Sequence, residues 1–439
     1  MSHHLNDWNP EDESYWNRKG KYIATKNLSV SIPCLLLSFS VWFIWSAVAV
    51  NLNNIGFNFT TEQLFTLAAV PGLSGATLRI FYSFTVPIFG GRNWTVFSTA
   101  TLLIPAFGIG FAVQDLNTSY ELMLLLAASC GFGGGNFSSS MSNISFFFPK
   151  NKQGTALGLN AGLGNLGVSV LQFTVPIVIG FSFFESFLGA GKETISIDGS
   201  VKTLWLQNAA FIWIIPVILS TVASFFLMDN LPTAKGSLKE QLIIFKRKHM
   251  YITTWLYIMS FGSFIGYSAA FPLLIKTQFP EIGNPLKYAF LGPMVGALIR
   301  PIGGWFSDKL NSGALVTFLD LFIMIFSVFG VIYFISPDSK NFAGFFWLFI
   351  ILFITTGIAN GSVFQMIPKI FIKKEAAAVL GFSAAIAAYG AFLIPKSFGA
   401  SIQVTGSPKF ALYCFIVYYI TCLLITWWYY LRKNAEVKC

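Results

Sequence analysis

The chain has 439 residues, of which 55% are hydrophobic and only 10% are charged. Soluble domains carry about 25% charged residues, so this composition excludes a soluble globular protein and indicates a chain that lies largely in lipid. The net charge of +10 could suggest a nucleic-acid partner. The basic residues, however, collect in the connections on one side of the predicted membrane, which argues for a role in membrane orientation instead.

Apolar segments long enough to cross a bilayer recur along the whole chain. The polar stretch before residue 28 has no apolar core, so we expect no cleavable signal peptide. The segments predict twelve transmembrane helices, at residues 28–52, 63–87, 93–114, 119–147, 153–182, 204–229, 250–277, 286–306, 313–335, 341–368, 375–402 and 409–431.

The basic residues orient these helices. Nineteen of the 28 Lys and Arg residues fall in the tails and connections on one side, seven fall on the other side, and Arg79 and Arg300 lie inside spans. Cytoplasmic connections carry the excess of Lys and Arg, so both termini are predicted to be cytoplasmic. We expect a multi-pass protein of a bacterial inner (plasma) membrane whose surrounding partner is the lipid bilayer, with no nucleic-acid partner.

Two internal matches indicate a repeat. Gly75–Arg79 reads GATLR and Gly296–Arg300 reads GALIR, at an offset of 221, and Ala156–Gly167 aligns with Val379–Gly390 at an offset of 223. The matches fall in spans two and eight and in spans five and eleven, as a repeat of six spans requires. We therefore predict an all-α membrane protein with twelve transmembrane helices in two pseudo-symmetric six-helix halves, the architecture of the major facilitator superfamily. The predicted parts are a cytoplasmic N-tail (1–27), an N-terminal half (28–229), a cytoplasmic linker (230–249), a C-terminal half (250–431) and a cytoplasmic C-tail (432–439).

Arg79 and Arg300 are costly residues inside a membrane, where an arginine at a helix centre costs about 2.5–3.5 kcal/mol on insertion scales. A structural explanation requires buried carboxylates, but Asp320 is the only acid well inside a span and cannot neutralise both. The functional explanation is that a bound anion supplies the negative charge. The planar donor fork of arginine suits a planar oxyanion, so we expect a small anion as substrate.

Span five contains a glycine motif. Gly162–Gly167 reads GLGNLG, which matches a dinucleotide fingerprint, but that fingerprint requires a preceding strand and here it lies in a membrane span. We expect Gly162, Gly164 and Gly167 to allow close helix packing at a moving interface.

Tyr257 and Phe261 share a helix face, and a buried tyrosine hydroxyl needs a hydrogen-bonding partner. The sequence has no nucleophile, metal or cofactor constellation, so we expect neither an enzyme nor a bound cofactor or metal.

Nearly the whole chain closely resembles the NarK-type nitrate/nitrite porters of the major facilitator superfamily. The stretches that carry the resemblance are Phe59–Arg92, Cys130–Gln172, Phe261–Pro280, Gly296–Lys309 and Gly357–Phe371.

This resemblance implies that nitrate and nitrite are the substrates and that the anion lies between Arg79 and Arg300. It further implies a hydrogen bond from Tyr257, a contact with Asn165, and aromatic walls formed by Phe137 and Phe261. The chain departs from the pattern in span eleven, where alanines replace the signature residues of span five: Ala385, Ala387 and Ala388 stand where that span has Gly162, Gly164 and Asn165.

The coupling mode follows from which groups can carry a proton. The three histidines, His3, His4 and His249, lie in the N-tail and the linker, and arginine does not release its proton in proteins. These observations favour nitrate/nitrite exchange, while Asp320 leaves a proton symporter as an alternative. A carrier of another small anion such as formate is a second alternative, and a nitrate sensor is disfavoured by the short tails. We expect the protein to function as a monomer.

Overall fold

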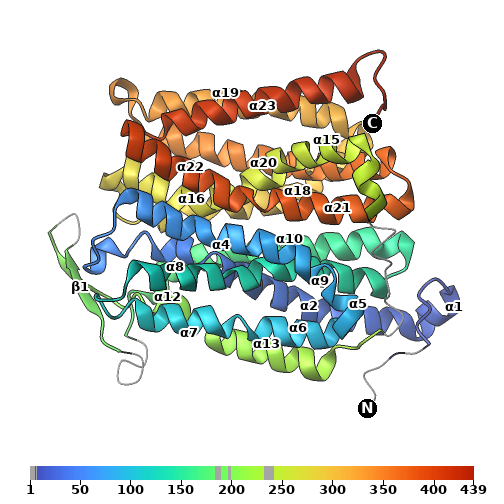
Figure 1. The fold of residues 1–439 in the computed structure, drawn as a ribbon, viewed down its shortest axis with the longest axis horizontal. Coiled ribbons are helices and arrows are strands. Elements are labelled where there is room, and N and C mark those ends of the chain that lie inside the picture. The colour runs from blue at the N-terminus through green and yellow to red at the C-terminus, as the bar shows by residue number, and fades with distance from the viewer. Residues whose placement is uncertain (1–4, 6, 183–188, 196–198, 232–241) are drawn as a thin grey trace. The chain divides into compact units, whose positions relative to one another are not determined.

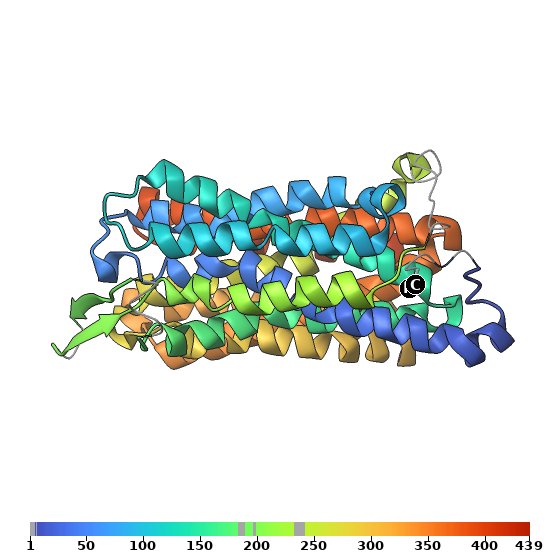
Figure 2. The same cartoon turned by 90° about the horizontal axis from the view of Figure 1, so that it is seen from below.

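The computed structural model describes residues 5, 7–182, 189–195, 199–231 and 242–439. These residues form two compact units: Met1–Asn58 with Val70–Ser237, and Phe59–Ala69 with Leu238–Cys439. We call them unit 1 and unit 2. Within each unit the long helices run roughly along a common direction (Figures 1 and 2). The predicted boundaries of the two six-helix halves stay a prediction, and residues 232–241 of the predicted linker lie outside the described residues.

The first unit contains most of the N-terminal helices. Its elements are α1 (Glu13–Tyr15), α2 (Lys21–Trp42), α3 (Ile44–Val48), the main part of α4 (Thr61–Tyr82), α5 (Thr85–Phe89), α6 (Gly91–Ala100), α7 (Leu103–Ala112), α8 (Tyr120–Ser129), α9 (Gly131–Phe147), α10 (Lys150–Val178), β1 (Lys192–Ile195), β2 (Val201–Leu204), α12 (Asn208–Phe211) and α13 (Ile214–Leu227).

The second unit contains the C-terminal helices. Its elements are α15 (Lys248–Tyr257), α16 (Ser263–Gln278), α17 (Leu286–Ala289), α18 (Leu291–Lys309), α19 (Gly313–Phe334), α20 (Phe342–Ile370), α21 (Lys373–Ala387), α22 (Gly390–Thr405) and α23 (Lys409–Thr426). A π-helical turn, Ile258–Gly262, joins α15 to α16.

Eleven helices in the described part of the chain are long and apolar enough to cross a membrane. They correspond to the predicted spans except the one at 119–147. That segment is helical, as α8 and α9, but α9 reads GFGGGNFSSSMSNISFF and its Gly, Ser and Asn residues lower the mean hydropathy. The all-helical membrane fold predicted from the sequence is therefore confirmed, with its fourth span built from small and polar residues.

Local side-chain chemistry sets several helix ends. Ser119 accepts a hydrogen bond from the backbone N–H of Leu122 at the start of α8, and Ser312 does the same for Leu315 at the start of α19. Such N-caps satisfy backbone donors that have no partner within the helix. Gly406 ends α22 with φ 71°, a left-handed conformation that favours glycine.

The repeat seen in the sequence is visible in helix packing. A Cβ on Gly167 of α10 would lie 2.1 Å from the carbonyl oxygen of Leu36 in α2. A Cβ on Gly390, its counterpart at an offset of 223, would lie 2.3 Å from the carbonyl oxygen of Gly262. In each unit a glycine therefore lets the fifth span touch the backbone of the first span of that half, which explains why both positions are glycine.

Helix α4 begins in the segment that clusters with unit 2 and continues into unit 1, with the boundary between Ala69 and Val70. Near its start, Glu62 forms an ion pair with Lys396 of α22. The same ammonium donates a 2.9 Å hydrogen bond to Thr66 Oγ1. Pro71 lies inside the helix just after the boundary.

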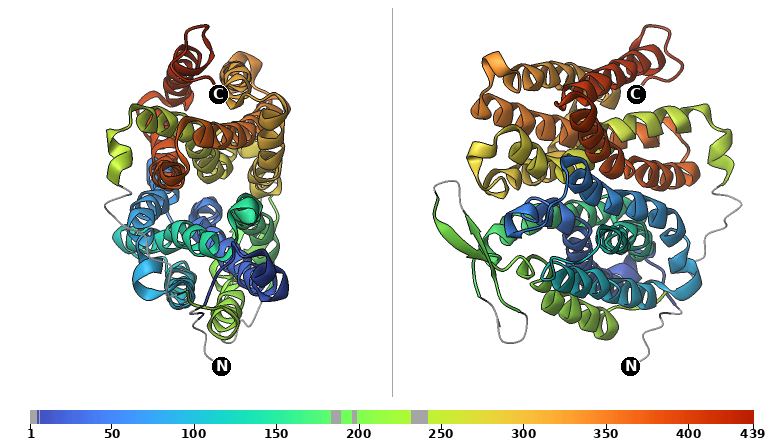
Figure 3. Two further views of the ribbon diagram at one scale, coloured as in Figure 1. Left: turned by 90° about the vertical axis from the view of Figure 1, so that its right-hand side faces the viewer. Right: turned by 60° about the vertical axis from the view of Figure 1, so that its left-hand side comes forward.

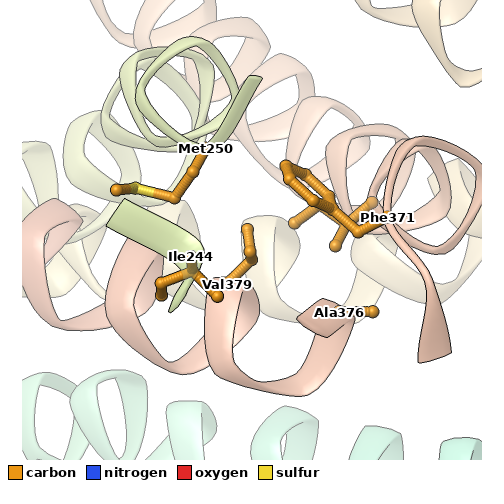
Figure 4. Packing of buried hydrophobic residues seen from close by; sticks show 6 residues of the cluster. Ile244, Met250, Phe371, Ala376 and Val379 are labelled. Atoms are coloured by element: carbon orange, nitrogen blue, oxygen red, sulfur yellow. The ribbon is translucent and has the colours of Figure 1, made fainter. Parts of the chain in front are cut away.

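Two smaller features complete the fold. Antiparallel strands β1 and β2 pair in the register Lys192 with Leu204 and Ile195 with Val201, and the hairpin extends beyond the ends of the unit 1 helices (Figures 1 and 3). In unit 2, a buried cluster joins the 3₁₀ turn Leu242–Lys246 to the surrounding helices; its labelled members in Figure 4 are Ile244, Met250, Phe371, Ala376 and Val379.

Candidate functional site

Each unit holds one of the two membrane arginines. Arg79 lies on α4 in unit 1 and is 0% exposed. Its Nε donates a 2.9 Å hydrogen bond to the carbonyl oxygen of Gly134 on α9. The guanidinium carbon lies 4.6 Å from the ring centre of Phe137 and 5.0 Å from that of Trp42. Aromatic faces attract cations, so two rings and a backbone oxygen fix the orientation of this guanidinium.

Small residues make room for this arrangement. A Cβ on Gly134 would lie 2.7 Å from the Cα of Gly75, and a Cβ on Gly75 would lie 2.6 Å from Nε1 of Trp42. Helices α4 and α9 therefore approach each other at backbone distance, one turn from Arg79. Trp42 is held in turn by a 2.6 Å hydrogen bond from its Nε1 to the carbonyl oxygen of Pro71.

Arg300 lies on α18 in unit 2 and is 9% exposed. Its Nη2 donates a 3.2 Å hydrogen bond to the hydroxyl oxygen of Tyr257. Its guanidinium carbon lies 4.7 Å from the ring centre of Phe364 on α20. Among the described residues, no carboxylate forms an ion pair with Arg300. Neutral groups therefore orient this buried cation, and no described carboxylate offsets its positive charge.

Tyr257 is the centre of the unit 2 arrangement. It is fully buried at the end of α15, next to the π-helical turn. Its hydroxyl donates to Oδ1 of Asn360 over 3.5 Å, and its ring stacks on Phe261 at 5.7 Å and on Phe364 at 5.1 Å. Short π-helical segments are frequent at functional sites.

The side chains that surround Arg79 and Arg300 are similar in kind but differ in detail. Phe137 and Phe364 each lie over a guanidinium, whereas Phe261 lies against Tyr257. The sequence singled out Phe137 and Phe261 but missed Trp42, Asn360 and Phe364. The i, i+4 spacing of the last two places them on one face of α20 and could have indicated their joint role.

Asn165, on α10, is 1% exposed, and its Oδ1 has no hydrogen-bonding partner among the described residues. The neighbouring amides behave differently. Asn136 donates to Ser38 Oγ at 2.8 Å, and Asn160 donates to Ser140 Oγ at 2.8 Å, so both join helices to one another. Because Asn136 and Asn160 use their amide N–H donors between helices, Asn165 is the candidate of the three for a ligand contact.

The three signature glycines of α10 have different neighbours. A Cβ on Gly164 would lie 2.6 Å from Cγ of Leu35, and one on Gly167 would meet the backbone of α2. A Cβ on Gly162 would have no atom within 4 Å. In this conformation, two of the glycines lie at a tight helix crossing and the third lies beside open space.

Asp320 lies apart from the contacts made by both arginines. It is 4% exposed on α19, and its Oδ2 has no hydrogen-bonding partner among the described residues. The described residues also contain no group of three or more metal-ligating side chains that could hold an ion.

Comparisons with known proteins agree with this architecture. The sequence profile of the Major Facilitator Superfamily matches residues 31–395. The chain is 48% identical to the nitrate/nitrite transporter NarU of Escherichia coli (strain K12), over 99% of this chain and 97% of that protein. It is 43% identical to a protein of Thermus thermophilus named "Probable nitrate/nitrite antiporter NarK2", over 99% of this chain and 98% of that protein. Among solved structures, the inward-open xylose transporter XylE from E. coli matches with a TM-score of 0.68 at 13% identity, over 95% of this chain and 98% of that one, which shows the shared fold.

Proposed function

Because the chain belongs to the major facilitator superfamily, we propose that it is a secondary transporter that carries nitrate and nitrite across the membrane by alternating access. The observation that carries the substrate assignment is the 48% identity to a nitrate/nitrite transporter over almost the full length of both proteins. The chain is accordingly a carrier of the NarK type and not an enzyme.

Arg79 and Arg300 both contact the transported anion in this proposal. Each guanidinium is already oriented, by Phe137 in unit 1 and by Phe364 in unit 2, so little side-chain entropy is lost on binding. Nitrate is a small planar oxyanion whose oxygens can accept hydrogen bonds from the planar donor fork of arginine. The absence of a described carboxylate partner for Arg300 supports the same role, because a bound anion then neutralises a buried charge.

Tyr257, Asn165, Phe137 and Phe261 complete the proposed site. The hydroxyl of Tyr257 is fixed by Arg300 and holds a proton that an oxyanion would accept more strongly than the amide of Asn360 does. Asn165 supplies a buried side-chain amide whose N–H donors would bond the anion. The aromatic rings exclude water and restrict the anion to a small, flat one.

Exchange is the proposed mode of coupling. Arginine does not deprotonate in proteins, so the charge of the binding groups changes only when an anion binds or leaves. Moving uncompensated buried charges costs free energy, and a bound anion lowers that cost in both directions of the cycle. The loaded carrier is therefore expected to reorient faster than the empty one, which produces antiport. The name of the Thermus relative supports the same mode.

The chain is proposed to work as a monomer in a bacterial inner membrane, with both termini in the cytoplasm. The distribution of Lys and Arg residues between the two sides supports this orientation. The lipid bilayer is then the partner of the exposed apolar side chains that both units present, such as Phe326 on α19 and Ile215 on α13.

Counterflow in proteoliposomes tests the proposed function. Purified full-length protein is reconstituted with nitrite, nitrate, formate or no anion inside, and uptake of labelled nitrate is followed with and without an inward proton gradient. We expect strong stimulation by internal nitrite or nitrate and little uptake driven by the gradient alone. Uptake into anion-free vesicles that follows the proton gradient would establish symport, and equal exchange with formate would overturn nitrate/nitrite specificity.

A further inference from the structure

An open groove of about 300 Å³ lies in unit 1, between the beginnings of α2 and α10. It is separate from the surroundings of Arg79 and shares no residue with them. Seven of its lining residues come from the two helices: Lys21, Thr25 and Leu28 from α2, and Lys152, Thr155, Ala156 and Leu159 from α10. Its volume is at the lower end of the ~300–1,000 Å³ that is typical of small-molecule sites.

Along the groove, each helix presents a charged, then a hydroxyl-bearing, then an aliphatic side chain. Lys21, Thr25 and Leu28 are spaced by four and three residues, so they share one face of α2. On α10 the corresponding residues Lys152, Thr155 and Leu159 are spaced by three and four. With a rise of 1.5 Å per residue, each series covers about 10 Å, from an ammonium through a hydroxyl to an aliphatic chain. A bilayer changes from headgroup to hydrocarbon over a similar depth.

The two lysines of the groove have no described carboxylate as an ion-pair partner. Lys26, in the same first turns of α2, differs because it forms a 2.8 Å ion pair with Asp229. In the N-terminal segment, Glu11 accepts a backbone hydrogen bond from Lys150, and Asp12 accepts one from Ser14. The positive charge of the groove is therefore available to an external group.

Aromatic side chains form the remaining wall. Trp16 is 4% exposed and packs in a buried cluster with Ile23, Ala24 and Phe147, which makes this wall rigid. The ammonium of Lys152 lies 5.3 Å from the ring centre of Trp16, an arrangement that holds the charge at the edge of an apolar surface. Leu159, at the deeper end, is 48% exposed.

We propose that this groove binds an anionic phospholipid of the cytoplasmic leaflet, with the phosphate at Lys21 and Lys152 and an acyl chain along Leu28 and Leu159. The leaflet assignment rests on the proposed orientation of the chain. A soluble phosphate would leave the apolar part of the groove in water, whereas a zwitterionic lipid would leave the second ammonium uncompensated. An anionic lipid satisfies both the two charges and the apolar lining.

The test uses the purified full-length protein in a neutral detergent. Its thermal unfolding and its lipid adducts in native mass spectrometry are measured with dioleoylphosphatidylglycerol, with dioleoylphosphatidylcholine and with glycerol 3-phosphate, which has the headgroup charge but no acyl chain. We expect binding and thermal protection with the anionic lipid only. Equal protection by glycerol 3-phosphate would overturn the lipid assignment in favour of a soluble anion, and equal binding of phosphatidylcholine would overturn the role of the lysines.

Substitutions in the groove, with a charge-matched control elsewhere, test whether the lipid binds there. The double variant Lys21→Gln with Lys152→Gln is expected to bind phosphatidylglycerol about 30-fold more weakly, at about fivefold for each lysine near a membrane surface. Lys192→Gln with Lys202→Gln removes the same charge from the β1–β2 hairpin and is expected to bind as the wild type does. Leu159→Ser, an exposed change that tests the acyl contact without altering charge, is expected to weaken the same lipid. Wild-type affinity in both groove variants would overturn the proposal.

Discussion

Replacing Tyr257 with phenylalanine removes the hydroxyl oxygen that contacts Arg300 and keeps the ring that stacks on Phe261 and Phe364. That oxygen accepts a hydrogen bond from Arg300 at 3.2 Å and donates to Asn360 over 3.5 Å. The second distance is at the long limit for a hydrogen bond, so a stronger acceptor can compete with Asn360 for the hydroxyl proton. Nitrate is such an acceptor, because hydrogen bonds to charged groups are the stronger ones.

The size of the expected effect follows from this geometry. A hydrogen bond to a charged group contributes about 1.5–3 kcal/mol, which corresponds to a loss of nitrate affinity of about 12- to 140-fold. Arg300 also loses its neutral acceptor in the empty site, and this loss favours anion binding. We therefore expect the lower half of that range. The stacking of the ring on Phe261 and Phe364 persists, so the variant should fold.

Nitrate affinity is measured by calorimetry on the purified protein, and exchange is measured by counterflow. Tyr267→Phe is the matched control, because Tyr267 is equally buried on the same continuous helix and its hydroxyl bonds to Tyr419 at 2.7 Å. The control variant is expected to keep the wild-type affinity. An unchanged affinity in Tyr257→Phe, or an equal loss in both variants, would refute the assignment of this hydroxyl to the anion.

Five further substitutions test other parts of the protein. Arg79→Lys and Arg300→Lys keep the charge but lose the planar fork, so each is expected to reach the membrane normally and to lose most nitrate uptake; near wild-type uptake in both would contradict a two-arginine site. Gly167→Ala places a Cβ 2.1 Å from a carbonyl oxygen of α2 and should lower the free energy of unfolding by about 1–3 kcal/mol in thermal or denaturant melts, whereas Gly162→Ala meets no atom within 4 Å and should not destabilise the protein. Asp320→Asn is expected to leave nitrate/nitrite exchange intact in proteoliposomes, and the loss of a proton-driven uptake in that variant would reassign coupling to this carboxyl group.

Much of the fold could be predicted because its signals are local. A membrane helix is recognised by its length and apolar content, and Arg79 and Arg300 stand out because charge is costly there. The repeat was readable because Gly167 and Gly390 meet the same steric need, a backbone carbonyl at the first helix of each half.

Other features depend on how the helices are rotated against one another, which the sequence does not encode locally. Trp42 and Phe364 lie over the two guanidinium groups, yet both come from Phe- and Trp-rich segments in which any ring could have faced inward. The motif GLGNLG likewise suggested one role for its three glycines. Gly162 differs from the other two because a Cβ there would have no atom within 4 Å.

Helix α4 has its first turns in unit 2 and its remaining turns in unit 1. Its first turns are tied to α22 through Glu62 and Lys396, and its later turns carry Arg79. Pro71 has no backbone N–H, so the helix lacks one hydrogen bond near the boundary and bends there at least cost. The arm from Pro71 to Arg79 is about 12 Å at 1.5 Å per residue, so a bend of roughly 10° displaces the guanidinium by ~2 Å. That displacement exceeds the tolerance of a hydrogen bond, so in the proposed transport cycle a bend at Pro71 would make or break the contact between Arg79 and the anion.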